Sequence, residues 1–519
     1  MFIKVSMLLL FFAVTIFVGL CSRKRASNVN DFVLGGRNVG PWLSAFSYGA
    51  TYFSAVVFVG YAGQFGWRFG TAAVWIGLGN AFIGSLMAWF ILGRRTRVMT
   101  NHLKSATMPE FFGSRYMSPA LKIGASIIVF IFLIPYTASL YNGLGRLFAM
   151  AFGNAGITFE YCVIAMGVLT AIFVVAGGYF ATTVNDCIQG TTTVAGIIAV
   201  IAVALNSKGG FSAAIDSLAR IPDPTVAPGA YTSFFGPDPL SLLGVFILTS
   251  FGAWGLPQMV ARFYSIKSER MIAKGAIVST IFAILVAGGC YFLGSFGRLF
   301  AEAPVAAMPA DGFDSIIPNI ISGFNSDALM GLVIVLVFAA SISTLSSLVM
   351  ASASTLTLDF LKGHVIKNMN GKQQLLTIRS LIVVFIAISS IVAIFQYQSR
   401  IAFIAQLMGI SWGALAGSFL APFLYGLYWK RASTISIWCC FAFSTSLMIL
   451  NILFRSAFPP IIQSPINAGA LCMLAGLIIV PLVSAITQAP DKAAVENCFS
   501  CYEETVSVKA SDVLPERSA

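Results

Sequence analysis

Long apolar runs, separated by short polar segments, make up most of the chain. A helix needs about 20 consecutive apolar residues to cross the hydrocarbon core of a bilayer, and thirteen runs approach or exceed this length. They lie near residues 2–20, 41–64, 71–93, 121–149, 158–177, 181–206, 240–261, 273–297, 328–357, 376–396, 402–428, 433–454 and 465–487. Because the runs are continuous, they favour helices over the alternating strands of a membrane β-barrel. The pattern predicts an all-α polytopic membrane protein with thirteen transmembrane helices.

The first run, residues 2–20, has a second interpretation as a secretory signal peptide. Its N-terminal flank carries only Lys4, and Leu20 before Cys21 fits neither a small-residue cleavage site nor a lipoprotein signal. We therefore favour a retained helix.

Composition and charge support a membrane protein and indicate its orientation. The 519 residues are 58% hydrophobic and 10% charged, whereas soluble domains contain about 25% charged residues. If the loops alternate between the two sides of the membrane, 23 of the 31 Lys and Arg residues fall on one side. Since basic loops stay in the cytoplasm, we expect the N-terminus outside, the C-terminus inside, and a location in the plasma (inner) membrane. The net charge of +12 then indicates membrane topology rather than a nucleic-acid partner.

Two predicted spans contain residues that interrupt helices. Residues 48–54 (YGATYFS) lie in the second span, and residues 252–257 (GAWGLP) lie in the seventh. Glycines and a proline at these positions predict breaks; a small-residue helix contact and a simple proline kink remain the alternatives. The two spans are five helices apart and enter the membrane from opposite sides, as an inverted-repeat transporter requires.

A carboxylate and a cluster of hydroxyls also lie within predicted spans. Asp186 is costly to bury unless a cation or another partner offsets its charge, although it is also interpretable as an interfacial residue near a helix start. Ser343, Ser346 and Ser347 share one helix face because they are spaced i, i+3 and i+4. These hydroxyls either ligate a small cation or bond back to their own helix. Together with the breaks, they predict an ion-coupled secondary transporter.

Five segments of the chain resemble the sodium–solute symporter family over about residues 31–430. They are DFVLGGRNVGPW, GATYFSA, GGYFATTVNDCIQG, GAWGLPQMVARF and FAASISTLSSLVMASASTLTLDF. The resemblance implies a LeuT-like five-plus-five inverted repeat, with helices 1–5 in residues 41–206 and helices 6–10 in residues 240–428. It also implies an extra N-terminal helix in residues 1–20, two C-terminal helices in residues 433–487, and a cytoplasmic tail in residues 488–519.

The resemblance further implies sodium as the coupling ion. The matching positions for a main sodium site are the carbonyl groups of Ala50, Phe53 and Ala340 and the hydroxyls of Ser343 and Thr344. Some family members bind a second sodium ion, and the matching side chains here are those of Asp186, Ser343, Ser346 and Ser347.

The implied substrate site lies beside the two breaks. Its candidate residues are Tyr52, Ser54, Thr249, Ala253, Trp254 and Gln406. Proline transporters of the family carry Trp and Tyr where this chain has Thr249 and Ala253, and Asp where it has Tyr52. We expect a small amino acid or carboxylate, because an unwound helix end offers N–H dipoles to an anion; no Arg or Lys is expected inside the membrane to bind it.

Several alternatives remain open at this point. The coupling ion is alternatively a proton, with Asp186 as the group that titrates. The solute of a sodium symporter is alternatively a sugar or a vitamin-like molecule. A channel is disfavoured because the chain has no filter-like repeat. An enzyme is disfavoured because general acid–base catalysis lacks its residues: neither of the two histidines falls in a predicted span, and hardly any acidic residue does. The partners are then a small-molecule solute and the lipid bilayer; a homo-oligomer stays open. Cys498 and Cys501 form one C-x-x-C pair in the tail, a weak metal signal.

Overall fold

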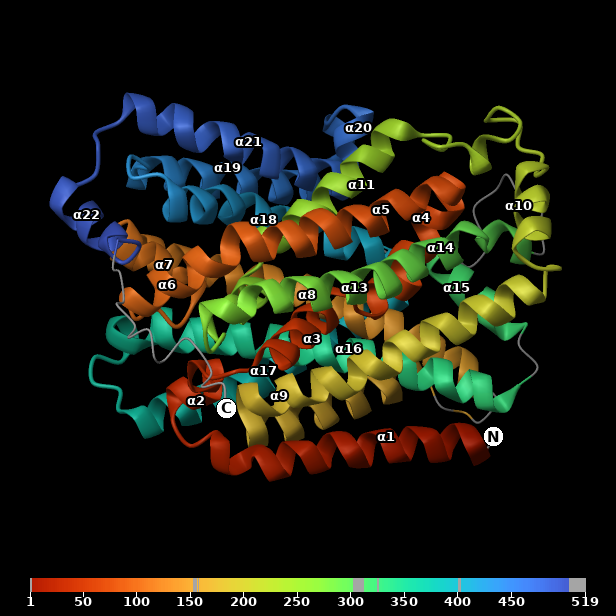
Figure 1. Ribbon diagram of the computed structural model, residues 1–519, viewed down its shortest axis with the longest axis horizontal. Coiled ribbons are helices and arrows are strands. Elements are labelled where there is room, and N and C mark those ends of the chain that lie inside the picture. The colour runs from red at the N-terminus through yellow and green to blue at the C-terminus, as the bar shows by residue number, and fades with distance from the viewer. Residues whose placement is uncertain are drawn as a thin grey trace, which may run out of the picture.

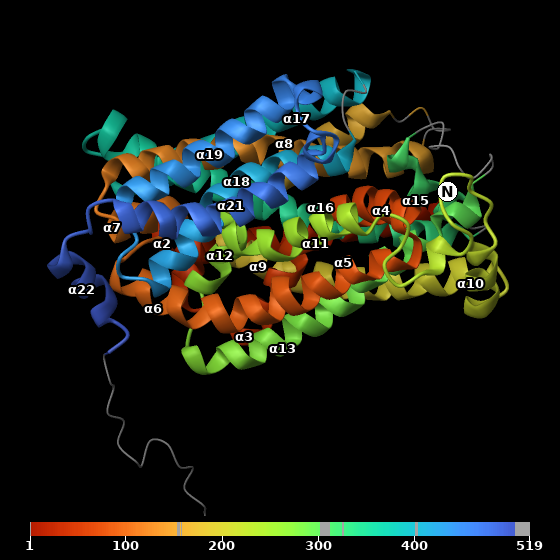
Figure 2. The same cartoon turned by 90° about the horizontal axis from the view of Figure 1, so that it is seen from above.

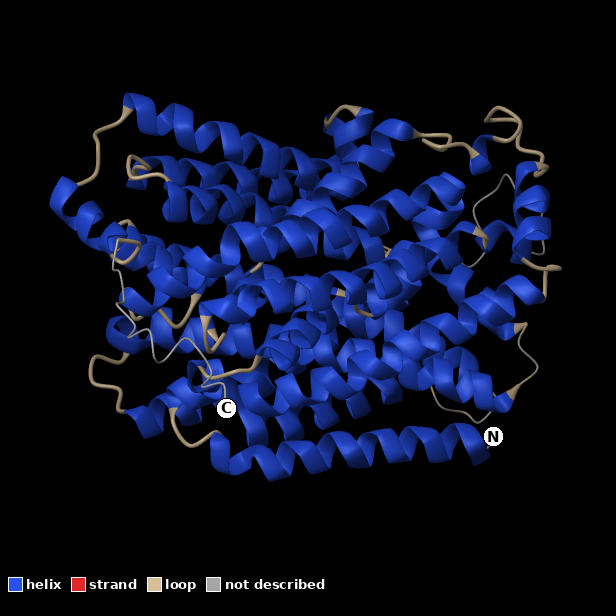
Figure 3. Cartoon of the chain, viewed as in Figure 1, coloured by secondary structure: helices blue, strands red, loops and turns tan. Residues whose placement is uncertain are grey.

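The chain folds into a bundle of helices that run mostly along its longest axis (Figures 1 and 3). The computed structural model describes residues 2–152, 156, 158–301, 312–323, 326–399 and 403–503. One end of the bundle carries α2 (Val29–Leu34), α6 (Arg94–His102), α7 (Met108–Arg115) and α22 (Lys492–Ser500). The opposite end carries the N-terminus, α10 (Phe211–Ala219) and α15 (Ile316–Ser322), as Figure 2 also shows. We call these the α22 end and the α10 end.

Ten helices of the described residues are long and apolar enough to cross a membrane, or eleven if one bent pair is a single span. The ten are built from α6 together with α1 (Phe2–Cys21), α4 (Ala62–Phe69), α5 (Val74–Gly79), α8 (Pro119–Phe152), α9 (Phe159–Asn206), α13 (Ile272–Ala283), α14 (Gly289–Ser295), α16 (Asp327–Thr355), α17 (Gly371–Ser399), α18 (Ile404–Tyr428), α19 (Thr434–Leu453) and α21 (Pro465–Ile486). The bent pair consists of Pro239–Gly255 and Pro257–Tyr264. The all-helical membrane architecture predicted from the apolar runs is confirmed.

Two of these helical stretches contain a glycine that interrupts them. Gly70 (φ 59°, ψ −140°) lies within the stretch Val56–His102, and Gly178 (φ 57°, ψ −152°) separates the two helices of α9. A residue with a Cβ rarely adopts these angles, and at Gly70 that Cβ would lie only 2.0 Å from the carbonyl oxygen of Tyr231. Glycine therefore allows the chain to turn sharply at both positions.

Both helices expected to be broken are interrupted in the structure. The helix α3 (Pro41–Tyr52) ends before Phe53, whose backbone is extended, and helical structure resumes at Val56. The helix α11 (Pro239–Gly252) continues as a short turn to Gly255, Leu256 is extended, and α12 (Pro257–Tyr264) starts at an angle of 45°. Each break leaves backbone carbonyl or N–H groups without helical partners.

The helix α16 lies at the centre of the bundle, where it packs against α1, α3, α8, α9 and α17. The helix α1 covers part of α9 and α16 and buries Leu8, Phe11, Thr15 and Gly19. At the α10 end, Lys4 of α1 pairs with Asp327 at the start of α16, with their charged atoms 3.0 Å apart. The N-terminal run is thus packed as a helix of the bundle.

The beginning of the predicted cytoplasmic tail, residues 488–519, packs against the helix bundle. Its residues form α22, where Cys498, Phe499 and Cys501 are buried. Tyr502 donates a hydrogen bond to the carbonyl oxygen of Arg95 on α6 at 3.1 Å. Apolar burial of α22 thus holds this part of the tail against α6. Residues 504–519 lie outside the described residues, as do Arg400, Lys509 and Arg517 of the charge count. In the part that the structure describes, no three His, Cys, Asp or Glu side chains are placed to hold a metal ion.

Candidate functional site at the helix breaks

Thr344 of α16 faces the end of α3 at the first break. Its hydroxyl lies 3.3 Å from the carbonyl oxygen of Ala340, 3.4 Å from that of Ala50 and 3.1 Å from that of Thr51. The carbonyls of Ala50 and Thr51 belong to the last turn of α3, where the break removes their usual helical donors. Thr344 is fully buried. One hydroxyl and three carbonyl oxygens therefore meet in a dry position, which is a suitable oxygen environment for a small hard cation.

The structure brings together only part of the predicted main sodium site. Ala50, Ala340 and Thr344 meet, and the carbonyl of Thr51 joins them. Ser343 turns away and donates a hydrogen bond to Oδ1 of Asp186 at 2.6 Å. Phe53 lies at the break itself, where its N–H bonds to the carbonyl of Gly49.

Asp186 lies two helical turns beyond Gly178, in the interior of the bundle and fully buried. Besides Ser343, its carboxylate accepts a hydrogen bond from Ser47 of α3. Its Oδ2 atom also lies 3.2 Å from a guanidinium nitrogen of Arg262. The carboxylate thus joins α3, α9, α12 and α16 at one point.

Arg262 is a basic side chain buried beside the helix breaks, a position that the apolar run ending at residue 261 does not predict. Arg262 directly follows the predicted span 240–261, but it lies on α12 and is only 2% exposed. Its guanidinium donates to Oγ1 of Thr51 at 2.8 Å and to the hydroxyl of Ser347. Pro257, which begins a new helix after the break, is the signal that would have located it: the apolar run ends at residue 261, but the helix continues.

Ser346 and Ser347 of α16 both bond back to the carbonyl of Ser343, but they differ in their other contacts. Ser346 donates to the carbonyl of Ser343 on its own helix at 2.8 Å, as the back-bonding alternative predicts. Ser347 also lies 3.1 Å from Oγ1 of Thr51 and thus contacts a neighbouring helix. A guanidinium therefore occupies the hydroxyl and carboxylate cluster that the resemblance assigns to a second sodium ion.

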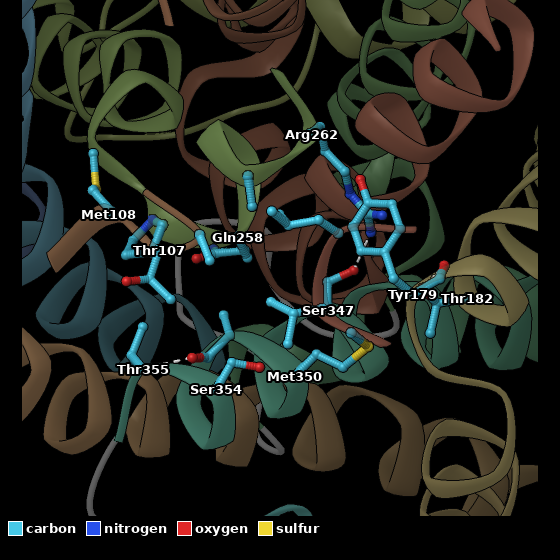
Figure 4. A pocket seen from close by; sticks show the side chains of 16 residues that line it. Thr107, Met108, Tyr179, Thr182, Gln258, Arg262, Ser347, Met350, Ser354 and Thr355 are labelled. Atoms are coloured by element: carbon cyan, nitrogen blue, oxygen red, sulfur yellow. Dashed lines mark hydrogen bonds between the residues drawn. The ribbon is translucent and has the colours of Figure 1, made fainter. Parts of the chain in front are cut away.

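A small cavity of about 50 Å³ approaches this cluster from the α22 end (Figure 4). Arg262 and Ser347 form its inner wall, and α2 and α7 contribute to its outer part. Polar groups of Thr107, Gln258 and Ser354 line the space between them. The carbonyl oxygen of the Gln258 side chain is buried without a hydrogen-bond partner in the described structure. The cavity therefore lies between the ion cluster and this end of the protein, with a few polar groups among mainly apolar lining residues.

The predicted substrate residues gather at the breaks, with one exception. Tyr52 donates its hydroxyl to the carbonyl of Thr249. Trp254 donates its indole N–H to the carbonyl of Ile83 at 3.0 Å. Ser54 accepts the N–H of Val56 at 3.2 Å. Ala253 is buried in the turn that follows α11.

Aromatic side chains that sequence reasoning missed complete this region. The ring of Tyr52 stacks on Trp412 of α18, with centroids 6.1 Å apart, and Trp412 packs edge-on against Tyr136 of α8 at 5.9 Å. No local pattern in the sequence marks these aromatics, since they come from helices far apart along the chain.

Gln406 lies apart from these residues. Its side-chain oxygen accepts the N–H of Phe403 at the start of α18, at 3.4 Å, and it lines a separate cavity toward the α10 end. Trp412 lies on the same helix, between Gln406 and the α22 end.

Comparison with known proteins identifies the family of the chain. A family model described as "Sodium:solute symporter family" matches residues 32–436. The osmoregulated proline transporter OpuE of Bacillus subtilis (strain 168) is 27% identical over 494 residues, covering 93% of this chain and 95% of the relative. A sodium/proline symporter of Staphylococcus aureus (strain JH9) is 29% identical over 447 residues, covering 83% and 82%.

Solved structures show a similar fold. A substrate-bound, outward-open Na⁺-coupled sialic acid symporter, whose structure is described as revealing a novel Na⁺ site, superimposes with a TM-score of 0.75. It has 18% identity and covers 95% of this chain and 99% of its own. With a family match over most of its length, this chain belongs to the sodium:solute symporter family.

Proposed function

We propose that this protein imports a small organic solute, an amino acid or a carboxylate, together with sodium by alternating access. The observation that carries the sodium coupling is the hydroxyl of Thr344 between the carbonyls of Ala50, Thr51 and Ala340. These groups would hold the ion, with Phe53 and Ser343 completing its shell when their carbonyl and hydroxyl turn inward. Sodium supplies the driving force, because one charge moving inward gains about 2.3 kcal/mol per 100 mV.

We further propose thirteen spans with a five-plus-five inverted repeat. In support, the glycines Gly70 and Gly178 each divide a helical stretch of 47 or 48 residues, about twice the length that a bilayer requires. The α22 end is proposed to face the cytoplasm. Arg23, Lys24 and Arg25 follow α1 there, and α6 begins with further arginines at the same end.

A second sodium site is proposed at Asp186, Ser343, Ser346 and Ser347. In this conformation Arg262 holds the carboxylate, so sodium and the guanidinium compete for one anionic group. Arrival of the ion would release Arg262 toward the cavity beside it. This exchange would couple ion occupancy to the position of α12, and so to the second broken helix.

The solute is proposed to bind beside the two breaks, near Tyr52, Ser54, Thr249, Ala253 and Trp254. Tyr52 and Thr249 tie the two broken helices directly to each other. A solute that displaces this hydrogen bond would therefore move α3 and α11 relative to each other. The proline-transporting relatives make an amino acid the first candidate.

The test is uptake by the purified protein in proteoliposomes. A panel of labelled amino acids, carboxylates, sugars and a sialic acid is offered with an inward sodium gradient or with choline in its place. We expect uptake of one amino acid or carboxylate that requires sodium. Equal uptake in choline at fixed pH, with dependence on a proton gradient, would replace sodium by protons; uptake of only a sugar would reject the solute class.

A further inference from the structure

The second cavity, at the α10 end, has features of a solute site of its own. It encloses about 190 Å³, less than a typical site for a drug-sized ligand. Gln64 and Arg68 of α4, Gln406 of α18 and Arg455 after α19 line it. Val245 also lines it, one turn before Thr249 on α11. The cavity, which we call the vestibule, therefore lies on the α10 side of the proposed central site.

Two arginines make the vestibule attractive to an anion. Arg68 is held by Asp238, with the charged atoms 2.7 Å apart, and by the hydroxyl of Ser241 at 3.1 Å. The guanidinium of Arg455 has no hydrogen bond or ion pair among the described residues, and none of the described residues that line the cavity is acidic. A planar guanidinium with free donors binds a carboxylate through two parallel hydrogen bonds.

Gln64 supplies the second polar feature. It is only 7% exposed, and its side-chain oxygen has no hydrogen-bond partner. Burying an amide oxygen without a partner is unfavourable, so this group is better satisfied when a donor enters the cavity. A carboxylate cannot satisfy it, because a carboxylate offers no proton, whereas an ammonium group can.

We propose that the vestibule is a first binding site for an amino-acid zwitterion, with the carboxylate at Arg455 and the ammonium at Gln64. The proposal rests on the proposed transport function, which it deepens by naming the solute class. A solute captured here would pass to the central site as Tyr52 and Thr249 separate.

The test is protection of Arg455 from phenylglyoxal in the intact purified protein, followed by peptide mass spectrometry. The probes are L-alanine, L-alaninamide, which lacks the carboxylate, and propionate, which lacks the amine. Arg220 is exposed on the loop after α10 and serves as the internal control for reagent consumption. We expect L-alanine to protect Arg455 about tenfold better than propionate, as one charge-assisted hydrogen bond would allow, and L-alaninamide to give no protection.

Two matched variants identify the ammonium partner. Gln64→Leu should reduce protection by L-alanine to the level of propionate. Gln258→Leu removes a second buried amide oxygen without a partner, but in the other cavity, and should change nothing. Equal protection by L-alanine and L-alaninamide, or a Gln64→Leu variant that behaves like the wild type, would overturn the proposal. Because the assay needs no transport, failed sodium-driven uptake with intact protection would count against the proposed function alone.

Discussion

The competition between sodium and Arg262 makes a quantitative prediction for the Arg262→Gln variant. Glutamine keeps a hydrogen-bond donor near Thr51 and Ser347 but removes the positive charge beside Asp186. If sodium must displace the guanidinium, binding of the ion is weakened in the wild type by the cost of that displacement. Removing the charge should therefore increase the apparent affinity for sodium.

The structure sets the size of the effect. At the 3.2 Å separation of Arg262 and Asp186, the attraction between two unit charges is about 5 kcal/mol for an effective dielectric constant near 20. Hydration of the released guanidinium in the adjoining cavity offsets much of this attraction. A remainder of about 1.4 kcal/mol already corresponds to a tenfold change in affinity. We expect the sodium concentration for half-maximal effect to fall about tenfold or more.

The assay is a sodium titration at constant ionic strength, read by thermal stabilisation of the detergent-solubilised protein and by uptake in proteoliposomes. Arg298→Gln is the control, because it removes another buried arginine, paired with Asp223 at the α10 end. Asp186→Asn should weaken sodium dependence, and in this background Arg262→Gln should have no further effect on sodium affinity. Gel filtration and the melting temperature without sodium verify folding.

An Arg262→Gln variant with unchanged or lower sodium affinity would refute the competition. So would the same shift in the Asp186→Asn background, because the effect would then not act through this carboxylate.

Two further substitutions test the ion site and the fold. Thr344→Ala should raise the sodium concentration for half-maximal uptake about tenfold, because it removes the buried hydroxyl. Thr344→Ser keeps a hydroxyl and should stay near the wild type. Equal sodium curves for both variants and the wild type would disprove the assignment of Thr344 to the ion site. Gly178→Ala should lower the melting temperature, because left-handed backbone costs about 1–2 kcal/mol for a residue with a Cβ and the new atom would lie 2.8 Å from the Phe32 ring. Gly371→Ala, where no atom lies within 4 Å, is its control, and equal melting temperatures would contradict the expectation.

The helix breaks show how much local sequence can predict. Gly255 and Pro257 interrupt a helix through their own backbone preferences, whatever surrounds them. The hydroxyl spacing on α16 likewise predicts a shared face, since helical periodicity alone decides it. The structure agrees with both breaks and places the hydroxyl of Thr344 at the first one.

The contacts between distant segments could not be predicted in the same way. The stack of Tyr52, Trp412 and Tyr136 joins three helices. The sequence places Gln406 beside Tyr52 in the substrate site, but its helix carries it to the other cavity. Such assignments depend on the rotation and depth of one helix against another, and side-chain spacing within a helix does not contain that information.

The apolar runs, the breaks and the basic loops are thus properties of the chain alone, because solvation by lipid and backbone geometry act on each segment separately. Arg262 shows what tertiary structure alone decides. Its residue type and its position one residue beyond an apolar run are equally consistent with a surface loop. Only the packing of α12 against α3, α9 and α16 brings its charge to Asp186, 76 residues earlier in the chain. A buried charge requires a partner, and which partner is available depends on how the helices assemble.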